Sequence, residues 1–484
     1  MQSIPSLQQA RTSIRLAGEI GCTGGPGEVL LGVCATLENA GISYCITHGY
    51  EEYPQRITSD VDFIISADVS PQRLAALLHE DRFFIGAEVM RRRPPTFILA
   101  GKSANGSPCF LVVDFCSAYD VEGLQYYTAS EVLLHRHKQQ HFYVPSSSLD
   151  FGCYLVRRIA KGSIDDKQGQ RLGRLYGQDV AGCRQHIARF WDAGSRVLIE
   201  SAALSGDWKS VRRRLSALRD ELRRRALRRT PRWPLAVDRA RRCWQPDGVH
   251  IVFLGPDGAG KSSVVRAVAS DWAGGFARTS HYGFAPGLLH RLLGRSFQAN
   301  PHPHAASPRS FLASVTRAVT YWFLNATLGY AATIRVDLIR SALVLNDRHF
   351  VDALVDPKRY RYAGPSWLLR LIWRLSPKPD LVILLDAPAE VLQARKREVP
   401  FEETVRQRDA YLALVRHMGC GRVVNAAQPL DQVVRDVNGI ILQHLSARNA
   451  LRMQSKYVFH GLRPAACPQA KDEPLPHSIR GTEQ

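Results

Sequence analysis

The sequence lacks the cysteine spacing of a zinc site or a disulfide framework. Its ten cysteines are scattered from Cys22 to Cys467 without a C-x-x-C pair, and such pairs are the usual sign of a metal or redox site. The first twenty residues, MQSIPSLQQARTSIRLAGEI, have no charged start followed by an unbroken apolar core, so they do not resemble a secretory signal. These absences favour a reducing compartment, and we expect a cytoplasmic protein.

Long apolar runs are also missing. The longest uncharged run extends from Ala318 to Ile334, but it contains Thr320, Asn325 and Gly329 and falls short of a comfortable bilayer span. We therefore expect a buried helix there. The chain has no zinc-finger spacing, no aromatic RNA-binding motif and no heptads joined to a basic region, which argues against a sequence-specific nucleic acid partner.

Acidic residues are scarce around residues 208–229, where much of the net charge of +20 is found. Apolar residues recur there at intervals of three and four, which predicts a helix with one apolar stripe and an arginine-rich opposite face; they are Trp208, Val211, Leu215, Leu218 and Leu222. The favoured interpretation is a connecting helix packed on a neighbouring domain. The alternative is a peripheral contact of the 208–229 helix with an anionic surface, nucleic acid or lipid.

The hydrophobic periodicity and the proline- and glycine-containing turns divide the 484 residues into five segments. We expect a tail over 1–25, a small α/β domain over 26–149, a helical, arginine-rich connector over 150–247, a second α/β domain over 248–446 and a polar, proline-rich tail over 447–484. A chain of this length can bury more than one core, so two domains and a connector are reasonable.

The second α/β domain opens with IVFLGPDGAGKSS, which satisfies G-x-x-x-x-G-K-[ST]. A buried-strand pattern precedes the motif and a helix pattern follows it, as a phosphate-binding P-loop requires. Glycines let backbone N–H groups converge on phosphate oxygens, and the helix N-terminus adds a positive dipole end. We expect ATP and Mg²⁺ as cofactors, with Lys261 on the phosphates and Ser262 on the metal. The nucleotide-binding residues would be Gly255, Asp257, Gly258, Ala259, Gly260, Lys261, Ser262 and Ser263.

Two further motifs follow the P-loop in order. ALVLN runs into NDRHF, and DLVILLDAP is followed by the charged segment ARKRE. Together the three motifs resemble the thymidylate kinase family of nucleoside-monophosphate kinases over residues 248–446. The resemblance implies a P-loop kinase fold, with a parallel sheet flanked by helices, and an ATP-dependent phosphotransferase.

The resemblance also implies roles for single residues. Asp257 would bind a hydroxyl of the acceptor nucleotide, Asp347 would organise Mg²⁺ and the acceptor phosphate, and Arg348 would clamp that phosphate. Family members with glycine inside the P-loop, as Gly258 is here, take their transition-state arginine from the lid. Arg395 and Arg397 are then the candidates.

One position departs from the family. Thymidylate kinases carry an arginine that reads the thymine edge on the helix before the D-R-[YH] strand, and counting back from Asp347 puts that position near Ala326. A site without its hydrogen-bond donor no longer selects the substrate that the donor recognises, so we expect dTMP to be a poor acceptor. The chain is similar to thymidylate kinase-like proteins of bacterial surface-polysaccharide clusters, which implies a nucleoside monophosphate or a phosphorylated or sugar-linked acceptor.

The N-terminal α/β domain resembles the nucleotidyltransferase superfamily. Gly49 stands eleven residues before the pair Asp60 and Asp62, and Asp114 follows on a later apolar strand. Alternate residues of a strand share a face, so the three carboxylates are candidate Mg²⁺ ligands. The family pattern has glycine or serine after the glycine, whereas Tyr50 stands here and would bring a bulky ring into the path of the nucleotide phosphates.

Three functions remain open from the sequence. The first is the P-loop kinase, the second a nucleotidyltransferase that uses Asp60, Asp62 and Asp114 with the P-loop domain as nucleotide sensor, and the third a non-catalytic ATP-binding scaffold. Intact Lys261 and Asp347 favour the first. The sequence leaves a homodimer open and does not identify the acceptor.

Overall fold

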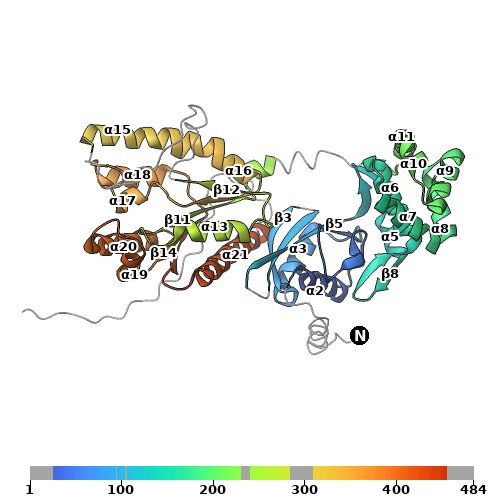
Figure 1. Cartoon of the computed structure of the whole chain (residues 1–484), viewed down its shortest axis with the longest axis horizontal. Coiled ribbons are helices and arrows are strands. Elements are labelled where there is room, and N and C mark those ends of the chain that lie inside the picture. Colours follow the sequence, from blue (N-terminus) through green and yellow to red (C-terminus); the bar gives the residue numbers. More distant parts are fainter. Residues whose placement is uncertain (1–24, 94, 104–105, 230–239, 284–308, 455–484) are drawn as a thin grey trace, which may run out of the picture. The chain divides into compact units, whose positions relative to one another are not determined.

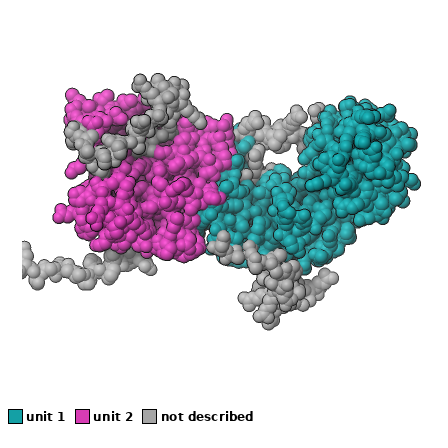
Figure 2. Space-filling model, viewed as in Figure 1, with its two compact units in different colours: residues 1–247, 271–277, 438–455 teal, residues 248–270, 278–437, 456–484 magenta. Residues whose placement is uncertain are grey.

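The computed structural model describes residues 25–93, 95–103, 106–229, 240–283 and 309–454. The chain forms two compact units (Figure 2). The first comprises residues 1–247, 271–277 and 438–455, and the second comprises 248–270, 278–437 and 456–484. Both the small α/β domain and the helical connector expected from the sequence are parts of the first unit.

The first unit contains a five-stranded mixed sheet with the order β1-β2-β5-β4-β3 (Figure 1). Its strands, in that order, are Tyr44–Ile46, Val61–Ile65, Pro108–Cys116, Thr96–Lys102 and Ala87–Arg93. Only β2 and β5 are parallel neighbours. Helices α2 (Pro26–Asn39), α3 (Pro71–Glu80) and α4 (Arg82–Ile85) contribute to its core, because their apolar residues recur on one face.

Smaller sheets and a helical region complete this unit. The remaining strands are β6 (Ala118–Val121), β7 (Leu124–Thr128), β8 (Arg136–Gln139), β9 (Phe142–Pro145) and β10 (Arg228–Arg229). The helices are η1 (Tyr50–Glu52), α5 (Ala129–Leu134), α6 (Ser147–Lys161), α7 (Asp166–Gln178), α8 (Val180–Phe190), α9 (Ala193–Ser205), α10 (Lys209–Arg213) and α11 (Leu215–Arg224). Helix α6 packs against α7, α8 and α11, so it is central to this helical region.

The arginine-rich segment forms two helices, α10 and α11, and its apolar stripe is buried. Trp208, Val211 and Leu222 are almost fully inaccessible, as the predicted packing on a neighbouring element requires. Several of its arginines have carboxylate partners inside the same unit: Arg212 pairs with Asp166, Arg223 with Glu122 and Arg225 with Asp192. These contacts favour the connecting role over contact with an anionic surface.

The second unit contains a parallel sheet with the order β12-β13-β11-β14-β15. Its strands, in that order, are Arg278–Tyr282, Ala342–Asn346, Val249–Leu254, Leu381–Asp386 and Gly421–Asn425. Strands β11 and β13 are buried at every residue, and continuous apolar runs are typical of parallel strands covered on both faces. The strand, P-loop and helix order expected at residues 249–271 is confirmed.

Helices flank this sheet. They are α13 (Lys261–Asp271), α15 (Phe311–Tyr321), the π-helical segment η2 (Trp322–Ile334), α16 (Arg335–Ile339), α17 (Asp352–Val355), α18 (Ser366–Leu375), α19 (Ala389–Arg395), α20 (Phe401–Arg416) and the start of α21 (Leu430–Gln454). From Asn438 onward, α21 belongs to the first unit. None of the described helices combines the length and apolar character needed to cross a membrane.

Two sequence expectations differ from the structure. The run from Ala318 to Ile334 is helical, but it is buried only in part, because Phe323 and Leu328 are exposed. Helix α21 continues past residue 447, where the sequence suggested a tail. Asn449 explains the continuation, since its buried amide donates hydrogen bonds to the carbonyl oxygens of Val89 and Met90 in β3.

Candidate functional site

The P-loop joins the carboxyl end of β11 to the start of α13. Three of its glycines have positive φ angles: 146° at Gly255, 85° at Gly258 and 83° at Gly260. A Cβ on Gly258 would lie 2.6 Å from the Leu392 carbonyl oxygen of α19. Only glycine tolerates both the backbone angle and this close approach, so the glycine spacing is a steric requirement of the turn.

Lys261 is the first residue of α13, and its side chain folds back over the loop. Its Nζ donates hydrogen bonds to the carbonyl oxygens of Gly255, at 2.6 Å, and Pro256, at 2.9 Å. Burial, together with the nearby charge of Arg348, lowers the pKa of Lys261 to about 8. Burying an ammonium group is unfavourable unless an anion compensates for its lost hydration, so this lysine is suited to a phosphate.

The Ser262 hydroxyl is exposed, and within the described residues it has no hydrogen-bond partner. A free hydroxyl at the second residue of the helix fits the role of a Mg²⁺ ligand. The loop, the buried lysine and this hydroxyl are therefore compatible with bound Mg-ATP.

The D-R-H motif reaches the same edge of the sheet. Strand β13 is parallel to β11, and Asn346 at its end is the register partner of Val252. Asp347 and Arg348 follow directly, so the parallel register brings them beside the P-loop. Asp347 is half-buried and has no hydrogen bond or ion pair to another described residue, which leaves its carboxylate free for a metal or a water.

Arg348 contacts the acidic residue of the P-loop. Its Nη2 donates to Asp257 Oδ1 at 3.0 Å. Burial alone would raise the pKa of Asp257, but the interaction with Glu398 and the charges of Lys261 and the neighbouring arginines outweigh it and hold that pKa well below its ordinary value. Asp257 is therefore a carboxylate at neutral pH.

A second arginine, Arg359, binds the other oxygen of Asp257. It also lies 3.4 Å from Glu398 Oε2, in the segment between α19 and α20. Arg359 lies outside the motifs that can be recognised in the sequence. The only sequence signal is the basic run KRYRY after the D-R-H motif, and such runs are usually solvated.

Asp352 is another residue that the sequence did not reveal. It is buried and accepts hydrogen bonds from the Tyr411 hydroxyl, at 2.9 Å, and the His349 backbone N–H, at 3.1 Å. Burial raises its pKa, and the charge of Arg348 opposes the rise. Asp352 thus fixes the segment that carries Arg348 to helix α20.

Within the described residues, the two candidate lid arginines make no hydrogen bond or ion pair with this cluster. Arg395 and Arg397 are both exposed, and Arg395 Nη1 donates to the Ala426 carbonyl oxygen at 2.8 Å, beyond the end of β15. Within the described residues, Arg397 has no hydrogen bond or ion pair. Arg408 of α20 holds Asp386 at the end of β14 through two hydrogen bonds of 2.7 and 2.9 Å.

The carboxylates of the first unit come together only in part. Asp62 on β2 and Asp114 on β5 are register partners on parallel strands, whereas Asp60 is exposed before β2. Asp62 is paired with Arg157 at 3.0 Å, and burial and the charges of Asp62 and Asp60 raise the pKa of Asp114, against a hydrogen bond with Thr96 that lowers it. No group of three carboxylates, histidines or cysteines suited to a metal is found in the described ranges.

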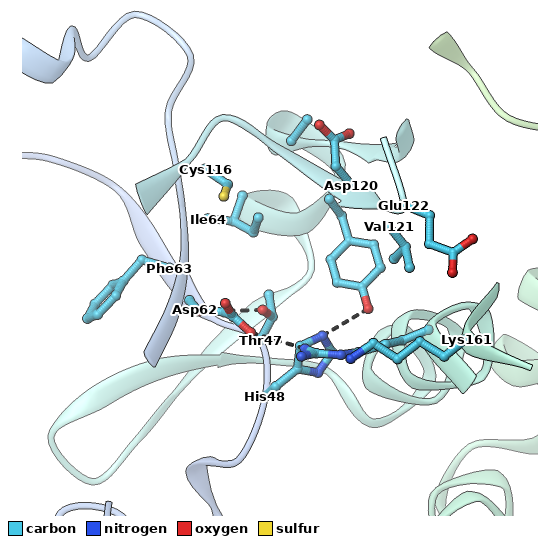
Figure 3. A pocket seen from close by; sticks show the side chains of 13 residues that line it. Thr47, His48, Asp62, Phe63, Ile64, Cys116, Asp120, Val121, Glu122 and Lys161 are labelled. Carbon is cyan, nitrogen blue, oxygen red and sulfur yellow. Dashed lines mark hydrogen bonds and ion pairs between the residues drawn. The ribbon is translucent and has the colours of Figure 1, made fainter. Parts of the chain in front are cut away.

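A pocket of about 200 Å³ opens beside Asp62 (Figure 3). Its lining includes Thr47, His48 and Lys161 as well as Arg157. Tyr50 does not line it, because the ring is buried and its hydroxyl donates to Asp150 Oδ2 at 2.8 Å. The expected obstruction by Tyr50 is therefore not observed, since this side chain is held in the core.

Comparisons with known proteins identify thymidylate kinases as relatives of part of the chain. No family model matches. The thymidylate kinase of Limosilactobacillus fermentum is 29% identical over 218 aligned residues, and the match covers 40% of this chain and 94% of that protein. The thymidylate kinase of Leuconostoc mesenteroides is 26% identical, and the match covers 42% of this chain and the whole of that protein.

Two further similarities are shorter or weaker. The "Probable thymidylate kinase" of Thermococcus gammatolerans is 30% identical over 123 residues, and the match spans 57% of that protein and 23% of this chain. The crystal structure of thymidylate kinase from Ehrlichia chaffeensis has 16% identity and a TM-score of 0.29, covering 40% of this chain and 98% of that one. Over about 40% of its length, this chain therefore contains a segment similar in sequence to thymidylate kinases.

Proposed function

We propose that the second unit is an ATP- and Mg²⁺-dependent kinase that phosphorylates a small acceptor carrying a phosphate. The observation that carries the proposal is the convergence of Lys261, Arg348, Arg359 and Asp257 at the carboxyl ends of β11 and β13. Phosphoryl transfer depends on positioning and on cations over the transferred group rather than on covalent chemistry. The cluster supplies both the cations and the positioning.

ATP would lie against the P-loop residues Gly255 to Ser263, and it would supply the γ-phosphoryl group that passes to the acceptor with loss of ADP. Lys261 supports this because its buried ammonium now rests on backbone carbonyls, which are weaker partners than phosphate oxygens. Ser262 and Asp347 would hold Mg²⁺, since both side chains lack partners in the described parts of the chain.

The acceptor would carry a phosphate dianion. Arg348 and Arg359 both point their guanidinium groups at one carboxylate, Asp257, and two arginines over one anionic group match the charge of a phosphate monoester. When the two arginines bind that phosphate instead, Asp257 is free to accept a hydrogen bond from an acceptor hydroxyl. Nucleoside monophosphates and sugar phosphates both carry a phosphate and a hydroxyl group.

Thymine recognition has little support. Ala326 lies in η2, and no lysine or arginine occurs between Ala318 and Ile334. We therefore propose that dTMP is a poor acceptor and that the natural one is another nucleoside monophosphate or a sugar-linked phosphate, as a role in surface-polysaccharide metabolism would require.

The test is transfer of label from ATP labelled in its γ-phosphate to a panel of nucleoside monophosphates and sugar phosphates, with Mg²⁺ present. The proposal expects one class of acceptor to become labelled by the wild-type protein and not by Lys261→Ala. Hydrolysis of ATP without transfer to any member of the panel would argue against it.

A nucleotidyltransferase activity of the first unit is the second candidate. The adjacent register of Asp62 and Asp114, beside a pocket that contains Arg157 and Lys161, favours it over the scaffold. It predicts release of pyrophosphate from a nucleoside triphosphate, lost in the double variant Asp62→Asn, Asp114→Asn and retained in Lys261→Ala. Pyrophosphate release by the double variant at the wild-type rate would exclude it.

A further inference from the structure

Helix α18 is apolar on two sides. Leu368, Leu369 and Ile372 are buried against the second unit's core. On the other side Trp367 and Leu375 are 62% and 57% exposed, with Leu371 between them at 43%. A surface helix of a soluble protein normally has one apolar stripe, and a second, exposed one indicates a contact site.

The same exposed side carries cations without partners. Arg370 and Arg374 are exposed and make no ion pair or hydrogen bond with another described residue through their side chains. They alternate with Trp367, Leu371 and Leu375 at the three- and four-residue spacing of one helix face. No aspartate or glutamate occurs from residue 357 to residue 379, so nothing in this stretch neutralises them.

Helix α15 extends the pattern beside α18 (Figure 1). The Ser314 hydroxyl accepts a hydrogen bond from the Ala363 backbone N–H at 3.0 Å, which ties α15 to the turn before α18. Phe311 and Leu312 of α15 are 58% and 76% exposed. Residues 309–336 also contain no acidic side chain, and Arg317 is exposed.

We propose that the exposed face of α18, with the exposed residues of α15, docks on an anionic lipid surface. Tryptophan and leucine between arginines, without acidic neighbours, match an interface of anionic headgroups over acyl chains. Helix α18 has ten residues and would lie in the interface rather than span it. This inference is independent of the proposed kinase activity.

The charge pattern disfavours a second copy as the occupant. A two-fold contact brings the same patch of both copies together, so Arg370 and Arg374 would meet their own counterparts with no carboxylate from either α18. The connector is a less suitable lipid site, because Arg212, Arg223 and Arg225 already have carboxylate partners.

The experiment is flotation of the full chain with vesicles of phosphatidylcholine alone or with about one third phosphatidylglycerol. The wild-type protein is expected to float only with the anionic vesicles, less at high salt. The double variant Arg370→Gln, Arg374→Gln should bind about 30-fold more weakly, corresponding to about 1 kcal/mol for each arginine. Trp367→Ser, Leu371→Ser should lose most of the binding as well.

Matched controls change exposed residues elsewhere. Val197→Ser, Leu204→Ser removes two exposed apolar side chains of α9, and Arg213→Gln, Arg214→Gln removes two exposed connector charges. Both should float like the wild type. Absence of wild-type binding, or equal loss in the connector variant, overturns the proposal. So does a dimer in sedimentation velocity that Trp367→Ser, Leu371→Ser dissociates, because a second copy would then be the occupant.

Discussion

Arg348 Nη2 donates to Asp257 Oδ1 at 3.0 Å, although 91 residues separate the two in the chain. The contact joins the acidic residue of the P-loop to the arginine after β13. It exists because β11 and β13 are adjacent and parallel, so that the segments that follow them meet at one edge of the sheet. Arg348 and Asp257 thus define the place where we propose that the acceptor binds.

Arg359 should be needed for the acceptor and not for ATP. Because Arg359 binds Asp257 together with Arg348, Arg359→Ala should raise the acceptor KM by about 100-fold, the scale of a lost charge-assisted pair, and leave the Kd for ATP unchanged. Steady-state kinetics with titrated acceptor measures the first and calorimetry the second. Lys358→Gln, a change at a neighbouring exposed cation, is the control. Equal losses of ATP and acceptor binding would show a general structural role instead.

ATP affinity should fall in alkaline solution because of Lys261. Its pKa is lowered to about 8 in the unliganded protein, below the ordinary value, so the lysine loses its charge as the pH rises through 8. Phosphate binding needs the charged form, and each pH unit above 8 should therefore weaken ATP binding by about tenfold. Calorimetry in two buffers of different ionisation enthalpy should detect proton uptake at pH 9 and little at pH 7. A pH-independent affinity from 7 to 9.5 would contradict the assignment.

Asp352 should matter for stability. Its carboxyl is buried and accepts hydrogen bonds from the Tyr411 and Tyr360 hydroxyls and the His349 N–H, so Asp352→Ala leaves these three donors without their acceptor and should cost about 2–4 kcal/mol of unfolding free energy. Asp352→Asn keeps one acceptor oxygen and should cost less. Urea unfolding compares the variants, and a cost below about 0.5 kcal/mol for Asp352→Ala would mean that water satisfies these donors.

Of the two candidate lid arginines, Arg397 should contribute more to turnover. Arg395 is bound to the Ala426 carbonyl oxygen, whereas Arg397 has no partner among the described residues and is free to reach the transferred phosphoryl group. Arg397→Ala should lower kcat by about a thousandfold, as loss of a transition-state arginine does, and Arg395→Ala by less than tenfold. The reverse order would identify Arg395 as the transition-state residue.

The sequence revealed the parts of the site that a local pattern encodes. The P-loop spacing, the buried strands and the D-R-H motif could be found because each depends on neighbours in the chain. Arg359 and Asp352 could not, because their importance comes from contacts with Asp257 and Tyr411 that only the folded sheet creates. The hydroxyl contact of Tyr50 with Asp150 was hidden for the same reason.

The helix before β13 shows another limit. Its apolar composition predicted burial, but composition does not tell which side chains face a core and which face outward. Phe323 and Leu328 are exposed, and their exposure depends on how η2 lies against the sheet.

The central claim, that the second unit transfers phosphoryl groups, is tested most directly by label transfer from γ-labelled ATP to the best acceptor of the panel. Asp347→Asn should lower the rate by about a thousandfold, roughly 4 kcal/mol of transition-state stabilisation, while the double variant Asp60→Asn, Asp62→Asn keeps most of the wild-type rate. Loss of transfer in the double variant with normal transfer by Asp347→Asn would contradict the account and assign the chemistry to the first unit.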